Sequence, residues 1–155
     1  MSERDEKWMR IALEEARLAA AEGEIPVGAV IVRGDEPIAR AHNLCERTGQ
    51  ATAHAELLAI EMANRAVGSW RLSDATLYVT LEPCPMCAGA AINARIGRIV
   101  FAAKDARAGA CGSLINLPAY PLEARPECVS GVLAEESRAL LGDFFARMRE
   151  KNKKS

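Results

Sequence analysis

Two short segments of the sequence carry side chains that bind metals and move protons. One is the His54–Glu56 triplet, His-Ala-Glu, and the other is Cys84–Cys87, Cys-Pro-Met-Cys. Each pattern alone is weak, because an exposed His-Glu pair or two buried thiols have no chemical role in many proteins. Their joint occurrence in one chain indicates a single site with two thiols, one imidazole and one carboxyl group.

The two cysteines have the spacing of a metal-ligand pair. Pro85 is typical of the first residue of a helix, so Cys84 and Cys87 are expected in a first helical turn with both sulfurs on one side. The N-terminus of a helix favours the thiolate, which is the form that binds metal. His54 then supplies a third ligand, which leaves the fourth position of a tetrahedral zinc ion open, as in catalytic zinc sites.

Glu56 completes a hydrolytic mechanism at such a site. Zinc lowers the pKa of its bound water from about 15.7 to about 7 in favourable sites, so hydroxide is present at neutral pH. Glu56, two residues after His54, is expected beside that water as a proton shuttle. It would take the water proton and pass it to the substrate ring and then to the leaving ammonia. These residues predict a hydrolytic deaminase that uses zinc-bound hydroxide.

Two other interpretations of the same residues remain. A closed structural zinc site needs a fourth ligand, for which the candidates are Cys45, Cys111, Cys128 and His42. A redox-active thiol pair needs only the two cysteines and leaves His54 and Glu56 without a role.

The elements that must hold these residues follow from hydrophobic periodicity. Helices are predicted at residues 5–22, 53–67 and 85–94, and a final amphipathic helix carries Leu133, Leu140, Phe144 and Met148 on one face. Short apolar runs predict strands at residues 27–32, 38–42, 76–80 and 98–102, with the first two as a hairpin. Residues 43–53 and the Gly- and Pro-rich segment after Lys104 are predicted as loops. Because several strands are apolar on both faces, we expect an α/β domain of three layers with a covered central sheet.

Composition sets the class of protein. The 155 residues include 20 Lys and Arg against 21 Asp and Glu, and half of them are apolar, which indicates one globular domain spanning residues 1–155. The chain has no apolar run long enough for a membrane span and no leader-like N-terminus, and its five cysteines are an odd number. These features predict a cytoplasmic protein with thiols or metal ligands. The region from about residue 150 to 155 is basic, and a flexible tail is expected there.

The His-x-Glu and Pro-Cys-x-x-Cys segments resemble the signature of the zinc-dependent cytidine and deoxycytidylate deaminase superfamily. Within it the sequence is most similar to the bacterial tRNA-specific adenosine deaminases. The similarity extends from about residue 5 to residue 149, through EIPVGAVIV, AHAE, DATLYVTLEPCPMCAGA, RIGRIVFAAKDARAG and GDFF. It implies a cytidine-deaminase-like α/β/α fold with a mixed sheet of about five strands.

The resemblance also implies an activity and further site residues. The activity is hydrolysis of adenosine to inosine at the wobble position of a tRNA anticodon, by a homodimer with one zinc ion per subunit and no other protein partner. Asn43 would hydrogen-bond the flipped base and Val27 would line its pocket. Asp105 would contact a neighbouring ribose, where a 2′-hydroxyl distinguishes RNA from DNA, and Phe145 would stack near the anticodon.

Each of these four residues also has a plain structural interpretation: a turn asparagine, a core valine, a loop-capping aspartate and a core phenylalanine. The basic C-terminal residues Arg147, Arg149, Lys151, Lys153 and Lys154 would contact phosphates or only solubilise the chain end. Two other functions use the same residues: deamination of free guanine or cytosine, and non-catalytic RNA binding with a structural zinc ion.

Overall fold

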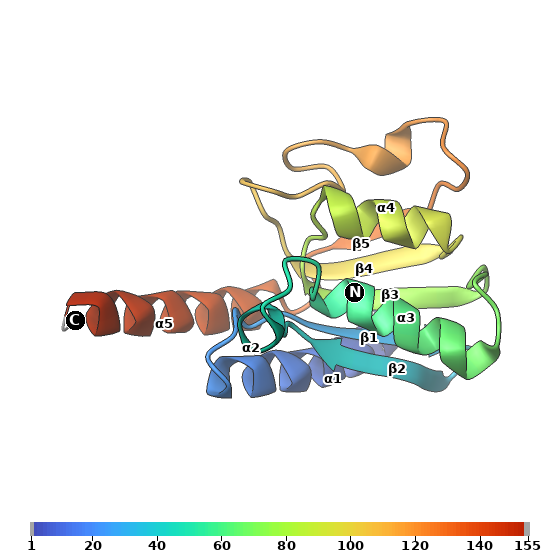
Figure 1. The fold of residues 1–155 in the computed structure, drawn as a ribbon. Helices are drawn as coiled ribbons and strands as arrows, with labels where there is room; N and C mark the ends of the chain where they lie inside the picture. Colours follow the sequence, from blue (N-terminus) through green and yellow to red (C-terminus); the bar gives the residue numbers. More distant parts are fainter. Residues whose placement is uncertain (1, 154–155) are drawn as a thin grey trace.

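Five strands form one mixed sheet in the computed structural model, which describes residues 2–153 (Figure 1). The spatial order is β2-β1-β3-β4-β5. Strand β1 is antiparallel to β2 and β3, whereas β3, β4 and β5 run parallel to one another. The strands are β1 (Gly28–Arg33), β2 (Glu36–His42), β3 (Ala75–Leu81), β4 (Arg98–Ala103) and β5 (Glu127–Ser130).

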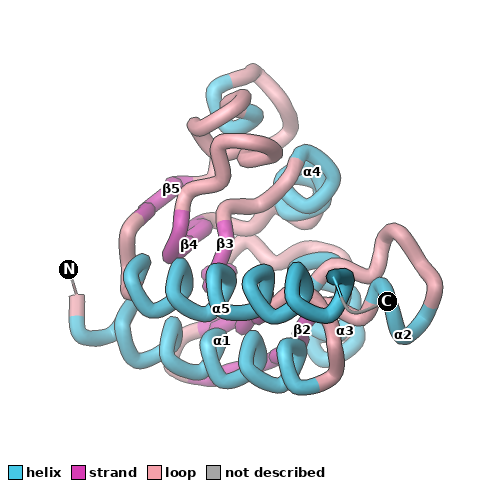
Figure 2. The backbone as a smooth tube through the Cα atoms, turned by 90° about the vertical axis from the view of Figure 1, so that its left-hand side faces the viewer, coloured by secondary structure: helices cyan, strands magenta, loops and turns pink. Residues whose placement is uncertain are grey.

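Helices cover both faces of this sheet. The long helices α1 and α5 lie side by side on one face, and α3 and α4 lie on the other (Figure 2). The structure therefore confirms the predicted three-layer α/β/α fold with about five strands. The helices are α1 (Glu3–Ala21), α2 (Cys45–Thr48), α3 (Ala55–Val67), α4 (Pro85–Asn93) and α5 (Ala134–Lys153), with a 3₁₀ turn at Leu117–Ala119.

Strand β1 shows why the sheet needs two covering layers. Val30 and Val32 are buried in the cluster beneath α1, and Ala29 and Ile31 are buried in the cluster beneath α3 and α4. Because successive side chains of a strand point to opposite faces, this unbroken apolar run requires a helix on each side.

Local sequence signals begin and end the helices that hold the site. The side chain of Ser2 accepts a hydrogen bond from the Asp5 N–H at the start of α1. Helix α3 ends at Gly68, whose φ of 68° is the left-handed conformation that glycine adopts without strain. Helix α4 begins at Pro85, as predicted, because this position needs no backbone N–H.

The structure differs from the sequence prediction in several elements. A fifth strand, β5, follows the proline-rich segment, where four residues pair with β4 although they show no alternating pattern. The segment predicted as a loop at residues 43–53 contains the single-turn helix α2. Leu133, predicted on the face of the last helix, precedes that helix with a φ of 56°.

The C-terminal helix reaches further than the sequence suggested. Helix α5 continues through Lys153, so most of the segment expected as a tail is helical. Lys154 and Ser155 lie outside the described residues. Among residues 2–153, none of the helices has the length and apolar character that a membrane span requires.

Candidate active site

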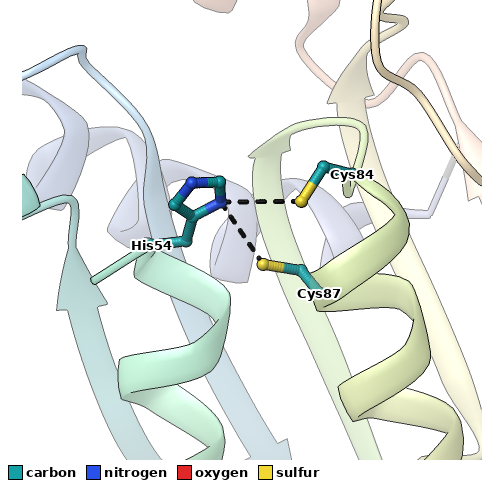
Figure 3. Close-up of side chains that lie close together, drawn as sticks. All are labelled: His54, Cys84 and Cys87. Atoms are coloured by element: carbon teal, nitrogen blue, oxygen red, sulfur yellow. Dashed lines mark hydrogen bonds between the residues drawn. The ribbon is translucent and has the colours of Figure 1, made fainter. Parts of the chain in front are cut away.

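Three side chains meet between the N-termini of α3 and α4 (Figure 3). His54 is the N-cap residue of α3, Cys84 is the N-cap residue of α4, and Cys87 lies in the first turn of α4. The Nδ1 atom of His54 lies 3.6 Å from the sulfur of Cys84 and 3.5 Å from the sulfur of Cys87. The structure thus brings together the three residues that the sequence predicts as metal ligands.

These distances fit a tetrahedral zinc site. With bonds of about 2.3 Å to sulfur and about 2.0 Å to nitrogen, tetrahedral geometry separates an imidazole nitrogen from a sulfur ligand by about 3.5 Å. Two soft thiol ligands and an imidazole are also the donor set that zinc prefers. The residues present therefore suit the ion in both geometry and chemistry.

The protonation of the cluster supports metal binding. A hydrogen bond from the Cys87 thiol, joined by one from His54, lowers the pKa of Cys84 to about 4. The hydrogen bond with Cys84 raises the pKa of His54, and the hydrogen bond to Cys84 together with burial raises the pKa of Cys87. The neighbouring donors thus favour the thiolate form of Cys84, because they stabilise the anion.

None of the four candidates for a closing fourth ligand belongs to this cluster. The ring nitrogens of His42 contact carboxylate oxygens of Glu15 at 2.9 Å and Glu22 at 3.1 Å. Cys111 and Cys128 line a different pocket, together with Phe101 and Ser130. Cys45 lines the pocket next to the cluster but is not one of its members. Within residues 2–153, the cluster consists of His54, Cys84 and Cys87 alone.

Glu56 lies in the first turn of α3, two residues after His54, and is 4% exposed. Burial raises the pKa of this carboxyl group to about 7. A carboxyl group with a pKa near neutrality accepts and releases protons readily at physiological pH. Glu56 lines the same pocket as His54 and Cys84, so a carboxyl group and the metal-binding cluster share one cavity.

That pocket has a volume of about 190 Å³ and also brings together Asn43, Val27 and Asp105. The amide of Asn43 is held from both ends: its nitrogen donates to the Ile25 carbonyl at 3.2 Å and its oxygen accepts from the Ala55 N–H at 2.8 Å. Val27 is 5% exposed and packs in the core at the pocket wall. Asn43 is thus a buried polar side chain rather than a residue of an exposed turn.

Asp105 and Phe145 lie at the outer part of the site. The Asp105 carboxylate accepts hydrogen bonds from the N–H groups of Arg107 at 3.0 Å and Ala108 at 3.2 Å, so it caps its own turn while lining the pocket. Phe145 is 42% exposed and lines an adjoining pocket of about 360 Å³, whose wall also includes Asp105. Its neighbour Phe144 is the buried member of the pair.

Among the pocket residues that the sequence did not predict are two buried carboxylates, Glu24 and Glu82. Glu24 is 1% exposed and accepts hydrogen bonds from the N–H groups of Glu46 at 2.9 Å and Arg47 at 2.7 Å in α2. Glu82 is 2% exposed and accepts hydrogen bonds from the loop after β4. Glu82 stands directly before the Pro-Cys-x-x-Cys segment, but its burial depends on a loop more than twenty residues further along the chain.

Comparison with known proteins agrees with this geometry. Residues 2–103 match the family model for the cytidine and deoxycytidylate deaminase zinc-binding region. The tRNA-specific adenosine deaminase of Bacillus subtilis is 50% identical over 96% of this chain and 93% of its own length. A solved structure from a study of A-to-I editing by tRNA:A34 deaminases has a TM-score of 0.85 and 43% identity, over 87% of this chain and 99% of that chain.

A guanine deaminase from Nitrosomonas europaea is a more distant structural neighbour. Its TM-score is 0.76 at 27% identity, over 91% of this chain and 84% of that chain. The identity and coverage of the first two relatives are far above what a shared fold alone requires. The chain is an enzyme of the cytidine and deoxycytidylate deaminase family and belongs, within it, to the tRNA-specific adenosine deaminases.

Proposed function

We propose that this enzyme hydrolyses adenosine to inosine at the wobble position of a tRNA anticodon, with one zinc ion per subunit held by His54, Cys84 and Cys87. The observation that carries the proposal is the shared pocket, in which buried Glu56 adjoins the His-Cys-Cys cluster. The substrate follows from the relatives, which are named tRNA-specific adenosine deaminases or tRNA:A34 deaminases.

Zinc in this site would act as a Lewis acid that makes water a better nucleophile at neutral pH. The chain itself must then move protons and hold the base. Glu56 takes a proton from the attacking water and delivers it to the purine ring nitrogen. It then takes the proton of the hydroxyl group added to the base and passes it to the amino group, which leaves as ammonia. Its burial suits this role, because a carboxyl group shielded from bulk solvent keeps the transferred proton at the reacting atoms.

Asn43 and Val27 position the base. One of the two amide N–H groups of Asn43 donates to the Ile25 carbonyl. The second can therefore donate to a ring nitrogen of the flipped purine. Val27 packs against the apolar face of the ring. An anticodon loop suits this pocket, because a base that is already partly unstacked costs less to extrude than a base within a duplex.

The outer residues account for an RNA substrate. Asp105, at the rim shared by the two pockets, accepts a hydrogen bond from the 2′-hydroxyl of a neighbouring ribose. Phe145, exposed on α5, stacks on a flanking base, and the basic end of α5 contacts phosphates.

Asp105→Asn is then expected to narrow the preference for RNA over single-stranded DNA, and an unchanged preference would limit Asp105 to capping its turn.

Deamination of free guanine is the second candidate function. It is favoured by the structural neighbour from Nitrosomonas europaea, a guanine deaminase, and by a pocket of about 190 Å³, which accommodates a free purine. Turnover of guanine, with none on an anticodon stem-loop, would support this function instead.

We place the enzyme in the cytoplasm, where tRNA is modified.

We also propose that the enzyme is a homodimer. Trp70, Tyr120 and Leu122 are each about half exposed, on the α3 and α4 side of the sheet. These side chains are where we expect the second subunit to pack. Sedimentation at micromolar concentration should give twice the subunit mass, and a monomer mass would contradict the assignment.

The decisive experiment measures inosine by mass in a synthetic anticodon stem-loop, with zinc-loaded wild type and the Glu56→Ala variant. We expect inosine from the wild type, and a loss of at least about 100-fold in Glu56→Ala, since general acid-base catalysis contributes about 10² to 10⁴-fold. Zinc content should stay the same.

Glu61→Ala is the matched control, since Glu61 is an exposed carboxylate on the same helix. It should keep wild-type turnover. Retained activity in Glu56→Ala would contradict the proton-transfer role, and an inactive wild type with zinc bound would contradict the tRNA assignment.

A further inference from the structure

The carboxylate of Glu82 is enclosed by the loop that follows β4. One oxygen, Oε1, accepts hydrogen bonds from the Asp105 N–H at 3.1 Å and from the Ser113 hydroxyl. The other, Oε2, accepts the N–H groups of Cys111 at 3.0 Å and Ser113 at 3.1 Å. A single buried side chain thus binds three separate points of the loop at residues 105–113.

Gly109 shows that the loop is shaped around this carboxylate. A Cβ atom at Gly109 would lie 2.4 Å from the Glu82 carboxyl carbon, from its Oε2 and from the Asp105 carbonyl oxygen. Such contacts are far shorter than van der Waals distance, so any side chain at residue 109 would displace either the carboxylate or the loop. The position requires glycine for the close approach of Glu82.

The loop that Glu82 holds forms a wall of the active-site pocket. Asp105 and Ala108 line both the pocket that contains Glu56 and the adjoining pocket of Phe145. The Ala110 N–H also donates to the Pro83 carbonyl at 2.8 Å, which joins the loop to the segment leading into Cys84. Glu82 therefore lies between the metal-binding turn and the wall that meets the nucleotides flanking the target base.

We infer that Glu82 is a positioning residue for substrate recognition, which sets Asp105 at the pocket rim through the hydrogen bond to its backbone N–H and requires glycine at residue 109. The inference rests on the proposed function, since the substrate that Asp105 meets is the anticodon loop. Glu82 itself touches no reacting atom and is not assigned a catalytic role.

The Glu82→Gln variant tests this role with little change in volume. A carboxylate only accepts hydrogen bonds, whereas an amide nitrogen only donates them. With the amide nitrogen in place of Oε2, two backbone N–H groups would face a donor. With it in place of Oε1, the Ser113 hydroxyl can turn to accept, but the Asp105 N–H still faces a donor. The less costly arrangement therefore disturbs Asp105.

The expected result is a separation of KM from kcat. In Glu82→Gln the KM for the anticodon stem-loop should rise about tenfold, the equivalent of one lost hydrogen bond of about 1.4 kcal/mol. The kcat should fall less than about threefold, and zinc content should stay at the wild-type value. Gly109→Ala should raise KM in the same way, because it displaces the same carboxylate.

Gly142→Ala is the matched control, because a Cβ at Gly142 meets nothing within 4 Å.

A double-mutant cycle tests whether the effect of Glu82 on KM passes through Asp105. If Glu82 acts by positioning Asp105, then Glu82→Gln combined with Asp105→Asn should raise KM no further than the larger single effect. Limited trypsin digestion adds a readout that needs no activity, since cleavage after exposed Lys104 and Arg107 should accelerate in Glu82→Gln.

The outcomes separate the two proposals. A wild type that binds zinc but makes no inosine in the stem-loop overturns the proposed function and, with it, this inference. An active wild type beside Glu82→Gln and Gly109→Ala variants of unchanged KM overturns the inference alone. Additive effects in the double-mutant cycle, or loss of zinc from Glu82→Gln, also overturn it, because Glu82 would then act through the metal-binding turn.

Discussion

Asn43 combines a structural and a chemical task in one side chain. Its amide joins the Ile25 carbonyl to the first N–H of α3, and α3 also carries Glu56. A residue that only closed a turn would not need two hydrogen bonds that cross the pocket. The amide therefore sets the distance between the pocket wall and the helix that bears the proposed proton shuttle.

Replacement of Asn43 by alanine should weaken both stability and catalysis. The buried Ala55 N–H loses its hydrogen bond, which costs about 1–3 kcal/mol of unfolding free energy, whereas the Ile25 carbonyl keeps the hydrogen bond that it accepts from the Val27 N–H. Urea unfolding measures the first effect, and kcat/KM for inosine formation should fall at least about tenfold. Ser137→Ala is the control, since it removes a buried hydrogen bond to Thr80 outside the pocket. Equal losses of kcat/KM in both variants would contradict the assignment of Asn43.

At the scale of elements, α1 and β1 approach each other closely at Gly28. A Cβ there would lie 2.0 Å from the Ala12 carbonyl oxygen and 2.6 Å from the Ala16 nitrogen. The apolar run of this strand indicates that both of its faces are covered, but not that the backbone of α1 approaches the sheet so closely at Gly28. Glycine at this position lets α1 lie directly on β1, the strand that follows Val27.

Gly28→Ala should therefore destabilise the protein. Overpacking of this kind costs about 1–3 kcal/mol or more, because α1 must move away from the sheet. Gly142→Ala, on an exposed part of α5 with free space around it, should leave stability unchanged or raise it slightly. Comparison of the two unfolding midpoints in urea checks the prediction, and equal midpoints would mean that no such close contact exists.

Helix α1 is joined to β3 and β4 by the buried carboxylate of Asp5. Arg98 donates two hydrogen bonds of 2.7 Å to Asp5, and the Tyr78 hydroxyl donates one of 2.8 Å. The bond with Arg98 lowers the pKa of Asp5 to about 2, below its ordinary value of 3.8. A carboxylate with a lowered pKa in the folded state stabilises the protein above the unfolded-state value and loses that contribution as pH falls.

The Asp5→Asn variant should show this pH dependence. A difference of nearly two pKa units corresponds to about 2 kcal/mol of stability at pH 7. The difference between wild type and variant should shrink as pH falls from about 4 to about 2, where Asp5 becomes protonated. Chemical unfolding at pH 7 and pH 3 measures it. Asp35→Asn, which removes an exposed ion pair with Arg4, should show no such dependence.

For the whole molecule, the metal cluster joins α3 to α4. Its ligands come from the first turns of two helices that are thirty residues apart in the chain. A metal that binds only the folded state stabilises it by mass action, by about 4 kcal/mol at a free concentration 1,000 times Kd. Zinc should therefore contribute to the stability of the whole fold as well as to the chemistry.

Removal of zinc by a chelator should lower the thermal unfolding midpoint, and added zinc should restore it. Cys87→Ser should unfold at the lower midpoint with or without chelator, because a thiolate ligand is lost. Cys128→Ser, a cysteine outside the cluster, should respond like the wild type. If the thermal unfolding midpoint of the wild type does not change when the chelator is added, metal binding at this cluster is contradicted.

The sequence by itself determined which side chains gather at the candidate site and where most of the elements lie. Residue types with strict spacing carry that information locally: Pro85 begins α4, so Cys84 and Cys87 share one side of its first turn, and His54 and Glu56 share the start of α3. The tertiary structure confirmed the meeting of His54 with the two cysteines. Short apolar runs likewise predicted four strands, and the apolar residues on both faces of several of them predicted the two covering layers.

Only the tertiary structure decided the features that depend on distant partners. Strand β5 exists because β4 offers it hydrogen bonds, although its four residues carry no strand pattern. Glu24 and Glu82 are polar residues whose burial becomes possible only when backbone N–H groups from α2 and from the loop after β4 converge on them. Local spacing cannot specify such contacts, because their donors lie twenty or more residues away and meet the carboxylates only in the folded chain.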